Sequence, residues 1–409
     1  MKTSFTILSA AILLTLSLFG AEQPDAAWPG WRGPSHDGHA PVNCDPPVAW
    51  PAALRVVWQT DVGAGFSSPI SDGSRVFLQH RSPTEEYVSA FDAATGRKLW
   101  QTTLATLIEP QTHDPAATPC VSGESIFVHS VAGAVLRMNS SDGKQIWKRE
   151  FASEWKGAKF RPFYGVAASP LLDGDTVVLP IGDTETGKIV ALKQSDGATA
   201  WEQATSAPGY GSTVPLTLGG QSCLATLLYH ELVVLKKTGA RVEPGFSFKL
   251  PGGGDGNSAT PLLIGENRLL ITSHEATVAL NVQPGATRCD EAWRLEAGGD
   301  LSSPVFANGR VYLHNSSELL CIDPTDGKTL SHIAMDGQYC ALIVWGSVLI
   351  CRLHDGAVKC VDIRDASLKV LAAYPPPQDA GESWSAPMPL TPTSFVMRAG
   401  TKLLRLSIK

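Results

Sequence analysis

A small residue followed by proline recurs along most of this chain of 409 residues, and this recurrence limits the fold more than any other feature. Successive prolines lie 43 to 51 residues apart, and a final interval of 83 residues spans two units, with Leu342 at the missing proline position. A period of this size predicts an array of similar supersecondary units. The pairs are Ser68-Pro69, Thr118-Pro119, Ser169-Pro170, Val214-Pro215, Thr260-Pro261, Ser303-Pro304 and Ala386-Pro387.

Each unit contains four short segments rich in Val, Ile and Leu, separated by tight turns such as Asp72-Gly73 and Asp173-Gly174. These signals are typical of antiparallel hairpins. Beyond the N-terminal apolar run, no stretch has sustained helical periodicity. Four antiparallel strands per unit, repeated radially, predict the blades of an all-β propeller.

The number of fourth segments indicates how the ring closes. Seven units contain one, whereas the eighth, at residues 385–408, ends after three strands. Residues 56–59 stand unpaired ahead of the first unit, and we expect them to complete the last blade and remove its open edge. The sequence therefore predicts an eight-bladed β-propeller of four-stranded antiparallel blades, closed by an N-terminal strand.

The best-formed unit, residues 90–100, reads Ala-Phe-Asp-Ala-Ala-Thr-Gly-Arg-Lys-Leu-Trp. It resembles the tryptophan-docking motif of the quinoprotein-type (PQQ-like) propeller repeat, and the resemblance extends over about residues 55–409. Glycine accepts a positive φ in the turn, and a flat indole can stack between blades. The residues expected to serve this structural docking are Ala90, Gly96, Trp100, Gly143, Trp147, Ala191, Gly197 and Trp201.

The N-terminal residues predict export. Lys2, the apolar residues 7–19 and the small residues near Ala21 form a secretory signal peptide, residues 1–21, that is too short to span a bilayer. The first cysteine, Cys44, lies too far downstream for a lipid anchor, so we expect a periplasmic or extracellular protein without a transmembrane segment after signal removal. A net charge of −6 without a Lys/Arg cluster argues against nucleic acid as a partner. We expect a monomer.

Residues 22–54 form an N-terminal arm between the signal peptide and the propeller at residues 55–409. Residues 28–38 of this arm, Trp-Pro-Gly-Trp-Arg-Gly-Pro-Ser-His-Asp-Gly, resemble the opening of exported PQQ-like repeat proteins. Two tryptophans in a Gly/Pro-rich segment need a surface that buries them. We predict that the arm packs on the rim or channel of the propeller, and a partner-binding tail is the alternative.

Residues just before each first strand mark the candidate site. In a propeller of this type the connections between blades cross on one face, and the resemblance implies that quinoprotein ligand sites lie on that face, around the channel. Their mixture of charged and aromatic side chains is typical of a polar, concave ligand site, and a water-filled channel is the alternative. The ligand-binding candidates are His113, Asp114, Arg161, Tyr164, Tyr210, Asp255, Asn257, Asp300 and Trp384.

Histidines recur near the turns between second and third strands. Because these turns belong to different blades, we assign no metal site and interpret the histidines as hairpin caps. They are His80, His129, His230, His274, His314 and His354.

The seventh unit contains three cysteines. If Trp345-Gly346 and Asp355-Gly356 are two-residue turns, Cys340 lies opposite Cys351, and Cys351 lies opposite Cys360, all on one face. One disulfide among them is a hypothesis. Packing of three small apolar residues is the alternative.

The sequence leaves open whether the protein is a binding module or an enzyme. No nucleophile elbow or HExxH motif is present, which favours a non-catalytic binding or scaffold module on the channel face, with an envelope protein or a small polar ligand as its partner. The outer-membrane assembly propeller lipoprotein, built from the same repeats, is similar in fold.

The alternative implied by the resemblance is a quinoprotein dehydrogenase with PQQ and calcium. The chain lacks the Cys-Cys dipeptide of the alcohol-oxidising members, and Asp255 or Asp300 could serve as its base by position only. We therefore assign no cofactor. A lyase or glycan-active propeller is a third hypothesis.

Overall fold

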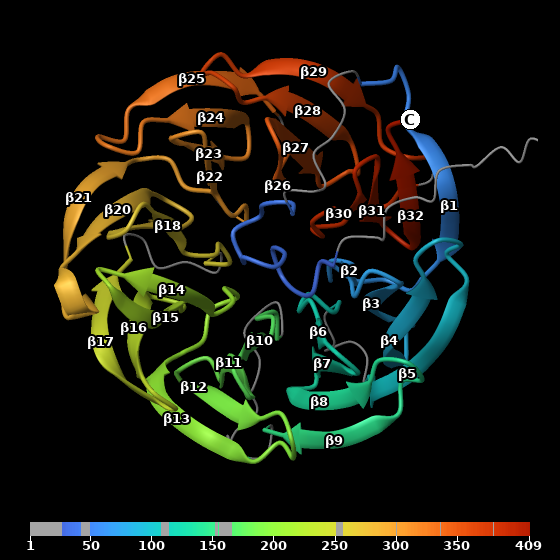
Figure 1. The fold of residues 1–409 in the computed structure, drawn as a ribbon, viewed down its shortest axis with the longest axis horizontal. Coiled ribbons are helices and arrows are strands. Elements are labelled where there is room, and N and C mark those ends of the chain that lie inside the picture. Colours follow the sequence, from blue (N-terminus) through green and yellow to red (C-terminus); the bar gives the residue numbers. More distant parts are fainter. Residues whose placement is uncertain are drawn as a thin grey trace, which may run out of the picture.

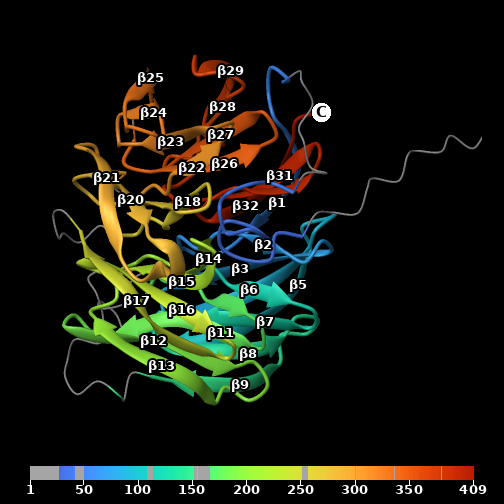
Figure 2. The same ribbon diagram turned by 60° about the vertical axis from the view of Figure 1, so that its left-hand side comes forward.

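The computed structural model describes residues 27–41, 50–107, 114–151, 154, 166–250, 257–299, 301–335, 337–378 and 380–409. Its strands form eight four-stranded antiparallel sheets arranged radially around a central channel (Figures 1 and 2). The predicted eight-bladed propeller is confirmed. Among the described residues, no helix has the length and apolar character needed to cross a membrane.

The first four blades follow the chain order, with the first strand of each blade innermost. Blade 1 contains β2 (Ile70–Ser71), β3 (Arg75–Arg81), β4 (Glu85–Asp92) and β5 (Lys98–Thr106). Blade 2 contains β6 (Cys120–Ser122), β7 (Ser125–His129), β8 (Ala134–Asn139) and β9 (Gln145–Glu150). Blade 3 contains β10 (Leu171–Asp173), β11 (Thr176–Gly182), β12 (Thr186–Lys193) and β13 (Thr199–Ser206). Blade 4 contains β14 (Val214–Leu218), β15 (Gln221–Leu227), β16 (Glu231–Thr238) and β17 (Arg241–Lys249).

The next three blades repeat this order. Blade 5 contains β18 (Leu262–Ile264), β19 (Arg268–Thr272), β20 (Thr277–Val282), the short 3-10 helix η3 (Pro284–Ala286) and β21 (Cys289–Leu295). Blade 6 contains β22 (Val305–Ala307), β23 (Arg310–His314), β24 (Glu318–Ile322) and β25 (Thr329–Ala334). Blade 7 contains β26 (Cys340–Trp345), β27 (Val348–Leu353), β28 (Val358–Asp362) and β29 (Lys369–Tyr374).

Blade 8 joins the two ends of the chain. Its strands are β30 (Met388–Thr391), β31 (Ser394–Ala399), β32 (Lys402–Ser407) and β1 (Arg55–Asp61), and β1 is the outer strand. The antiparallel register of β1 with β32 runs from Arg55 opposite Ser407 to Asp61 opposite Lys402. The predicted closure by an N-terminal strand is therefore confirmed.

Four tryptophans of the outer strands, one each from blades 8, 1, 2 and 5, dock on the following blade. Each indole Nε1–H donates a hydrogen bond to a backbone carbonyl in the turn between the third and fourth strands of that blade. The pairs are Trp58 with Ala93 at 2.9 Å, Trp100 with Ser140 at 3.1 Å, Trp147 with Gln194 at 2.8 Å and Trp293 with Pro324 at 2.9 Å.

The glycine of each docking turn lies directly against the indole. Gly143 has φ +71°, and a Cβ added to it would lie 2.5 Å from the ring of Trp100. Gly96, Gly197 and Gly327 meet Trp58, Trp147 and Trp293 in the same way. Thus Trp100 packs against the glycine of the next repeat, and its strand partner within its own repeat is Ala90.

We expect Gly143→Ala to lower the free energy of unfolding by about 1 to 3 kcal/mol more than Gly174→Ala, because only the first change crowds an indole as well as straining the turn. Gly174 is the matched control, since its φ is +60° and nothing lies within 4 Å of its added Cβ. Denaturant unfolding measures both. Equal losses would show that docking does not constrain position 143.

Candidate channel site

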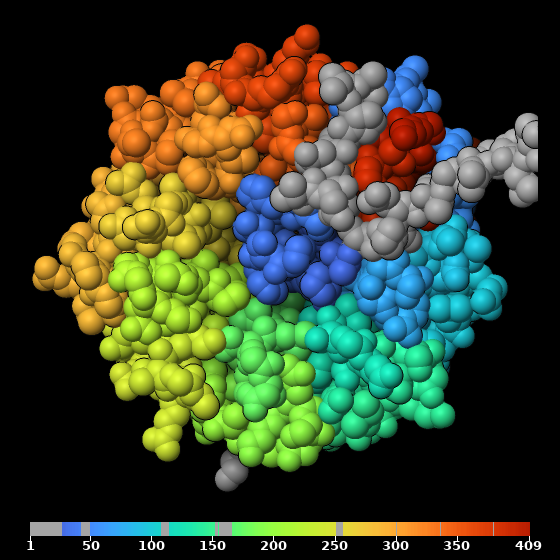
Figure 3. All heavy atoms as spheres, in the orientation of Figure 1, coloured from blue at the N-terminus to red at the C-terminus, as the bar shows by residue number. Residues whose placement is uncertain are grey.

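The N-terminal arm, described at residues 27–41, crosses the channel. Trp28 forms an antiparallel bridge with Ser71 at the end of β2. The carbonyl of Pro29 accepts a hydrogen bond from Val121 N at 2.8 Å, and Ala40 N donates to Val344 O at 2.8 Å. The arm therefore connects blades 1 and 2 with blade 7, and it covers the centre of the ring in Figure 3.

Two long side chains fix the middle of the arm. Trp31 Nε1 donates to Thr260 Oγ1 at 2.9 Å. The Arg32 guanidinium is buried and donates from Nη2 to the carbonyls of Pro304 and Asp37, each at 2.7 Å. Burial lowers the pKa of Arg32 to about 10. The arm thus packs inside the channel. This agrees with the prediction that it packs on the rim or channel of the propeller.

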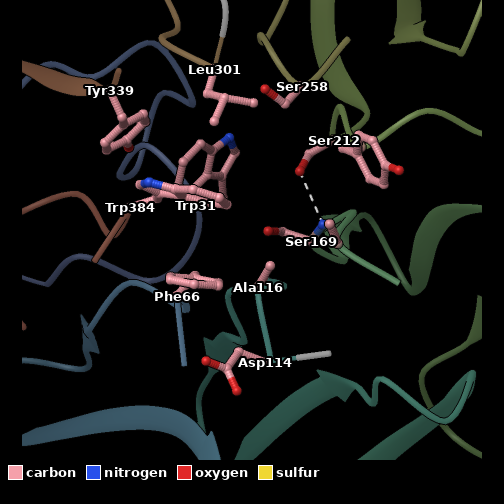
Figure 4. Close-up of a pocket in the computed structure, with 12 residues that line it drawn as sticks. Trp31, Phe66, Asp114, Ala116, Ser169, Ser212, Ser258, Leu301, Tyr339 and Trp384 are labelled. Carbon is pink, nitrogen blue, oxygen red and sulfur yellow. Dashed lines mark hydrogen bonds between the residues drawn. The ribbon is translucent and has the colours of Figure 1, made fainter. Parts of the chain in front are cut away.

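A pocket of about 140 Å³ lies at the end of the channel where the first strands begin. Its aromatic walls are Trp31, Phe66, Tyr210, Tyr339 and Trp384. The rings of Phe66 and Trp384 stack with centroids 4.5 Å apart and planes at 19°. Small residues complete the lining, with Ser169, Ser212 and Ser258 facing the aromatic group in Figure 4.

The structure brings three of the predicted site residues together. Asp114, Tyr210 and Trp384 all line this pocket. Asp114 Oδ1 accepts a hydrogen bond from Arg81 Nε at 2.6 Å, so its charge is paired. Asn257 is buried and is not among the lining residues, and its backbone carbonyl accepts a hydrogen bond from Tyr210 N at 3.1 Å.

The other predicted site residues, His113, Arg161, Tyr164, Asp255 and Asp300, lie outside the described residues.

Sequence reasoning missed Tyr339 and Leu301 and did not place Trp31 in a pocket. Tyr339 precedes β26, where the seventh unit has no Ser/Thr-Pro pair to mark the position. Burial raises the pKa of Tyr339 well above its usual range, so the phenol is neutral. The described lining is therefore more aromatic and less charged than the polar site expected from sequence.

Hydroxyl residues at or near the small-residue–proline pairs also have a role that sequence reasoning missed. At five of these pairs, the backbone N–H of the residue before proline donates to a hydroxyl of the next blade. That hydroxyl belongs to the residue before proline in four cases and to Ser212, two residues before Val214, in the fifth. These bonds run from Ala386 to Ser68, from Ser68 to Thr118, from Thr118 to Ser169, from Ser169 to Ser212 and from Thr260 to Ser303, at 2.8 to 3.1 Å. We call this series of bonds the hydroxyl belt, and two of its members, Ser169 and Ser212, also line the pocket.

The buried histidines bind neighbouring groups. His80 contacts Ser89 Oγ through Nε2 at 2.8 Å, and its Nδ1 accepts a hydrogen bond from Gly63 N at 3.1 Å. His129 Nδ1 lies 3.0 Å from Ala168 O. Burial lowers the pKa of His80 to about 3 and that of His129 to about 4, so both rings are neutral at pH 7. Within the described ranges, no group of three His, Cys, Asp or Glu residues could hold a metal ion.

The cysteine register expected from sequence is wrong. Cys340 pairs with Leu353, Cys351 with Lys359 and Leu342, and Cys360 with Ile350. Trp345 pairs with Val348, so the turn is one residue later than expected, and a one-residue shift between β27 and β28 moves Cys360 to the other face. All three cysteines are free.

Comparisons with known proteins agree with the fold. A family model described as "Outer membrane protein assembly factor BamB" matches residues 48–179 and 84–332. The outer membrane protein assembly factor BamB of Yersinia pestis is 27% identical over 285 residues, covering 67% of this chain and 59% of that protein. The quinoprotein alcohol dehydrogenase PedH of Pseudomonas putida is 26% identical over 163 residues, covering 37% of this chain and 26% of that protein.

Solved structures share the propeller. The quinohemoprotein alcohol dehydrogenase from Comamonas testosteroni has a TM-score of 0.73 at 12% identity, covering 95% of this chain and 81% of that chain. An identity this low supports the fold alone. The match also spans only 59% of the Yersinia relative and 26% of the Pseudomonas one.

The described pocket residues do not fit PQQ. PQQ is a quinone with several carboxylates, which need cationic donors, and the described lining contains no lysine or arginine. Its one carboxylate, Asp114, already pairs with Arg81. Calcium needs roughly six to eight oxygen ligands. Trp31 of the arm forms one wall of the same pocket.

We expect Thr118→Val to lower the free energy of unfolding by about 1 to 3 kcal/mol, because the buried Ser68 N–H loses its acceptor. The same change at Thr199, which is exposed on β13, serves as the control. Chemical denaturation compares the two variants. If both behave alike, the hydroxyl belt adds no stability.

We expect the free energy of unfolding to fall as the pH drops from about 6.5 to about 4. The folded-state pKa of His129 is about 4 and its unfolded value is about 6.5, so the unfolded chain binds the proton first and the loss is about 3 kcal/mol. Urea titrations across this range should show a shallower decline for His129→Gln and an unchanged one for the exposed His230→Gln. A decline of the same slope in His129→Gln would contradict the assignment.

Proposed function

Since the chain belongs to the outer membrane protein assembly factor BamB family, we propose that it is a non-catalytic scaffold of the cell envelope that binds a partner protein at the channel pocket. The observation that carries this proposal is the composition of the pocket: the chain's own Trp31 forms one wall, aromatic rings form most of the others, and the one described carboxylate is paired. Such a lining suits recognition rather than proton transfer or cofactor chemistry.

The size and chemistry of the pocket favour one inserted side chain. Cofactor and drug-sized ligands occupy roughly 300 to 1,000 Å³, whereas this pocket has about 140 Å³. An aromatic or aliphatic side chain could stack on the Phe66–Trp384 pair. The serine hydroxyls on the opposite wall could bind the backbone that carries it. A loop of an envelope protein has both features.

The wall of the pocket is built to keep its shape. Phe66 and Ser67 both donate their N–H groups to Pro115 O, at 2.7 and 2.9 Å. Trp384 adjoins Ser383, whose carbonyl accepts a hydrogen bond from the buried Arg352 guanidinium. A preorganised pocket loses little entropy when a side chain enters it.

We expect a photoreactive phenylalanine analogue at position 66 to form one discrete adduct with an envelope protein in cells of the native host. The same analogue at Leu99, which is exposed on β5, should form none. Trp384→Ala should reduce the adduct, because an entering side chain loses its stacking partner. Mass spectrometry of the adducts and melting temperatures of the variants measure these outcomes.

Equal labelling at positions 66 and 99 would contradict partner binding at the pocket. Purified protein that takes up PQQ and calcium stoichiometrically and oxidises alcohols with a dye acceptor would replace the scaffold function by the quinoprotein dehydrogenase alternative.

A further inference from the structure

Trp201 departs from the docking pattern of the other outer-strand tryptophans. It lies on β13 opposite Ala191, the position equivalent to Trp100 opposite Ala90. It is partly buried against an apolar cluster that includes Leu224 and Leu235 of blade 4. No carbonyl of the described residues accepts a hydrogen bond from its indole, in contrast to Trp58, Trp100, Trp147 and Trp293.

The reason is the length of the turn that should cover it. In blade 4, Thr238 pairs directly with Arg241, which leaves a two-residue turn of Gly239 and Ala240. In blade 1 the corresponding turn extends from Asp92 to Arg97 and is closed by a hydrogen bond from Gly96 N to Asp92 O. A Cβ added to Gly239 would have nothing within 4 Å, so this turn does not reach Trp201.

Blade 3 also lacks the arginine that assists docking elsewhere. Arg405, Arg137 and Arg268 donate to the carbonyls bound by Trp58, Trp147 and Trp293, respectively, at 3.1, 2.8 and 2.5 Å. Residues 171–206 contain no arginine, and Ala191 takes the place opposite the tryptophan that Arg137 holds in blade 2. The junction between blades 3 and 4 therefore has the indole, but it lacks both the longer turn and the arginine that accompany docking at other junctions.

The result is a pocket of about 530 Å³ between blades 3 and 4, here called the Trp201 pocket. Its residues come from the turn at Asp173–Thr176, from Lys193, from Ala200 and Trp201, and from the turn at residues 237–242. Two lining residues, Lys237 and Asp173, form an ion pair with 2.5 Å between Nζ and Oδ1. Lys193 and Arg241 remain exposed at its edge. In Figure 1 this junction lies between β13 and β17.

We propose that the Trp201 pocket binds an acidic, glycine-containing turn of a partner protein. Such a turn would occupy the place that a neighbouring blade fills at four other junctions, with its carbonyl on Trp201 Nε1 and its glycine against the ring. The docked turns of this chain carry aspartate before the glycine at Asp142, Asp196 and Asp326. Lys193 and Arg241 complement that charge.

This surface is separate from the channel pocket. The Trp201 pocket lies at the hairpin-turn ends of the blades, whereas the channel pocket is lined by Trp31 of the arm and by residues that precede the first strands. The inference therefore stands or fails independently of the proposed function. A cross-link from position 66 does not test it, and the experiment below does not involve the channel.

The test uses a peptide with the sequence of residues 320–331 that carries Cys321→Ser and is closed by a disulfide between added terminal cysteines, because it contains the turn that docks on Trp293. Titration into the full ¹⁵N-labelled protein should move one indole N–H signal, which is absent in Trp201→Phe. Replacing the glycine at 327 by valine in the peptide should abolish the movement. Arg241→Glu should weaken binding about threefold, and Lys144→Glu, an exposed charge on blade 2, should not change it.

The proposal is overturned if no indole signal moves at peptide concentrations up to about 5 mM, or if the same signal moves in Trp201→Phe. Binding of the valine peptide with unchanged affinity would also overturn it, because the pocket would then recognise something other than a docking turn.

Discussion

The antiparallel pairing of β1 with β32 is the interaction on which the rest of the molecule depends. It leaves no free strand edge between blade 8 and blade 1, and it places Trp58 against Gly96, so closure uses both backbone hydrogen bonds and indole docking. A closed ring fixes the diameter of the channel. The hydroxyl belt can then pass from Ala386 to Ser68, across the point where the two ends of the chain meet.

The channel that results is largely occupied by the protein itself. Related quinoproteins take their name from a quinone cofactor, whereas here Trp31 and Arg32 of the arm reach blades 5 and 6 from inside the ring. Arg32, Arg352 and Arg398 are buried, and burial lowers the pKa of each guanidinium. Backbone carbonyls accept most of their hydrogen bonds. Polar packing of this kind holds the aromatic pocket, whose one described carboxylate, Asp114, is paired with Arg81.

The repeat made the architecture predictable from the sequence. Features that do not follow the repeat could not be predicted in the same way. The Pro spacing, the Asp-Gly turns and the tryptophan motif recur in every well-formed unit, so blade number and closure follow from them. Asp114, Tyr210 and Trp384 could be selected because each lies just before a first strand. Asn257 lies in the same kind of position, yet its side chain turns into the wall to bind Tyr229 O. The arm does not repeat, so no pattern shows which blade Trp31 meets. The cysteine pairing failed because Trp345 belongs to β26 rather than to the turn.

The use of an N-terminal strand to complete the last blade also affects how the protein acquires its fold. β1 leaves the ribosome before the other described strands, and its partner β32 leaves after them. A contact of such high sequence separation forms slowly, because the entropy of closing the intervening loop is lost before the contact can stabilise the fold. Until β32 has been made, β1 is an unpaired edge that can add to a foreign sheet. Nascent chains of this topology therefore expose an unpaired strand for longer than a protein of the same length whose blades are each made from one contiguous segment.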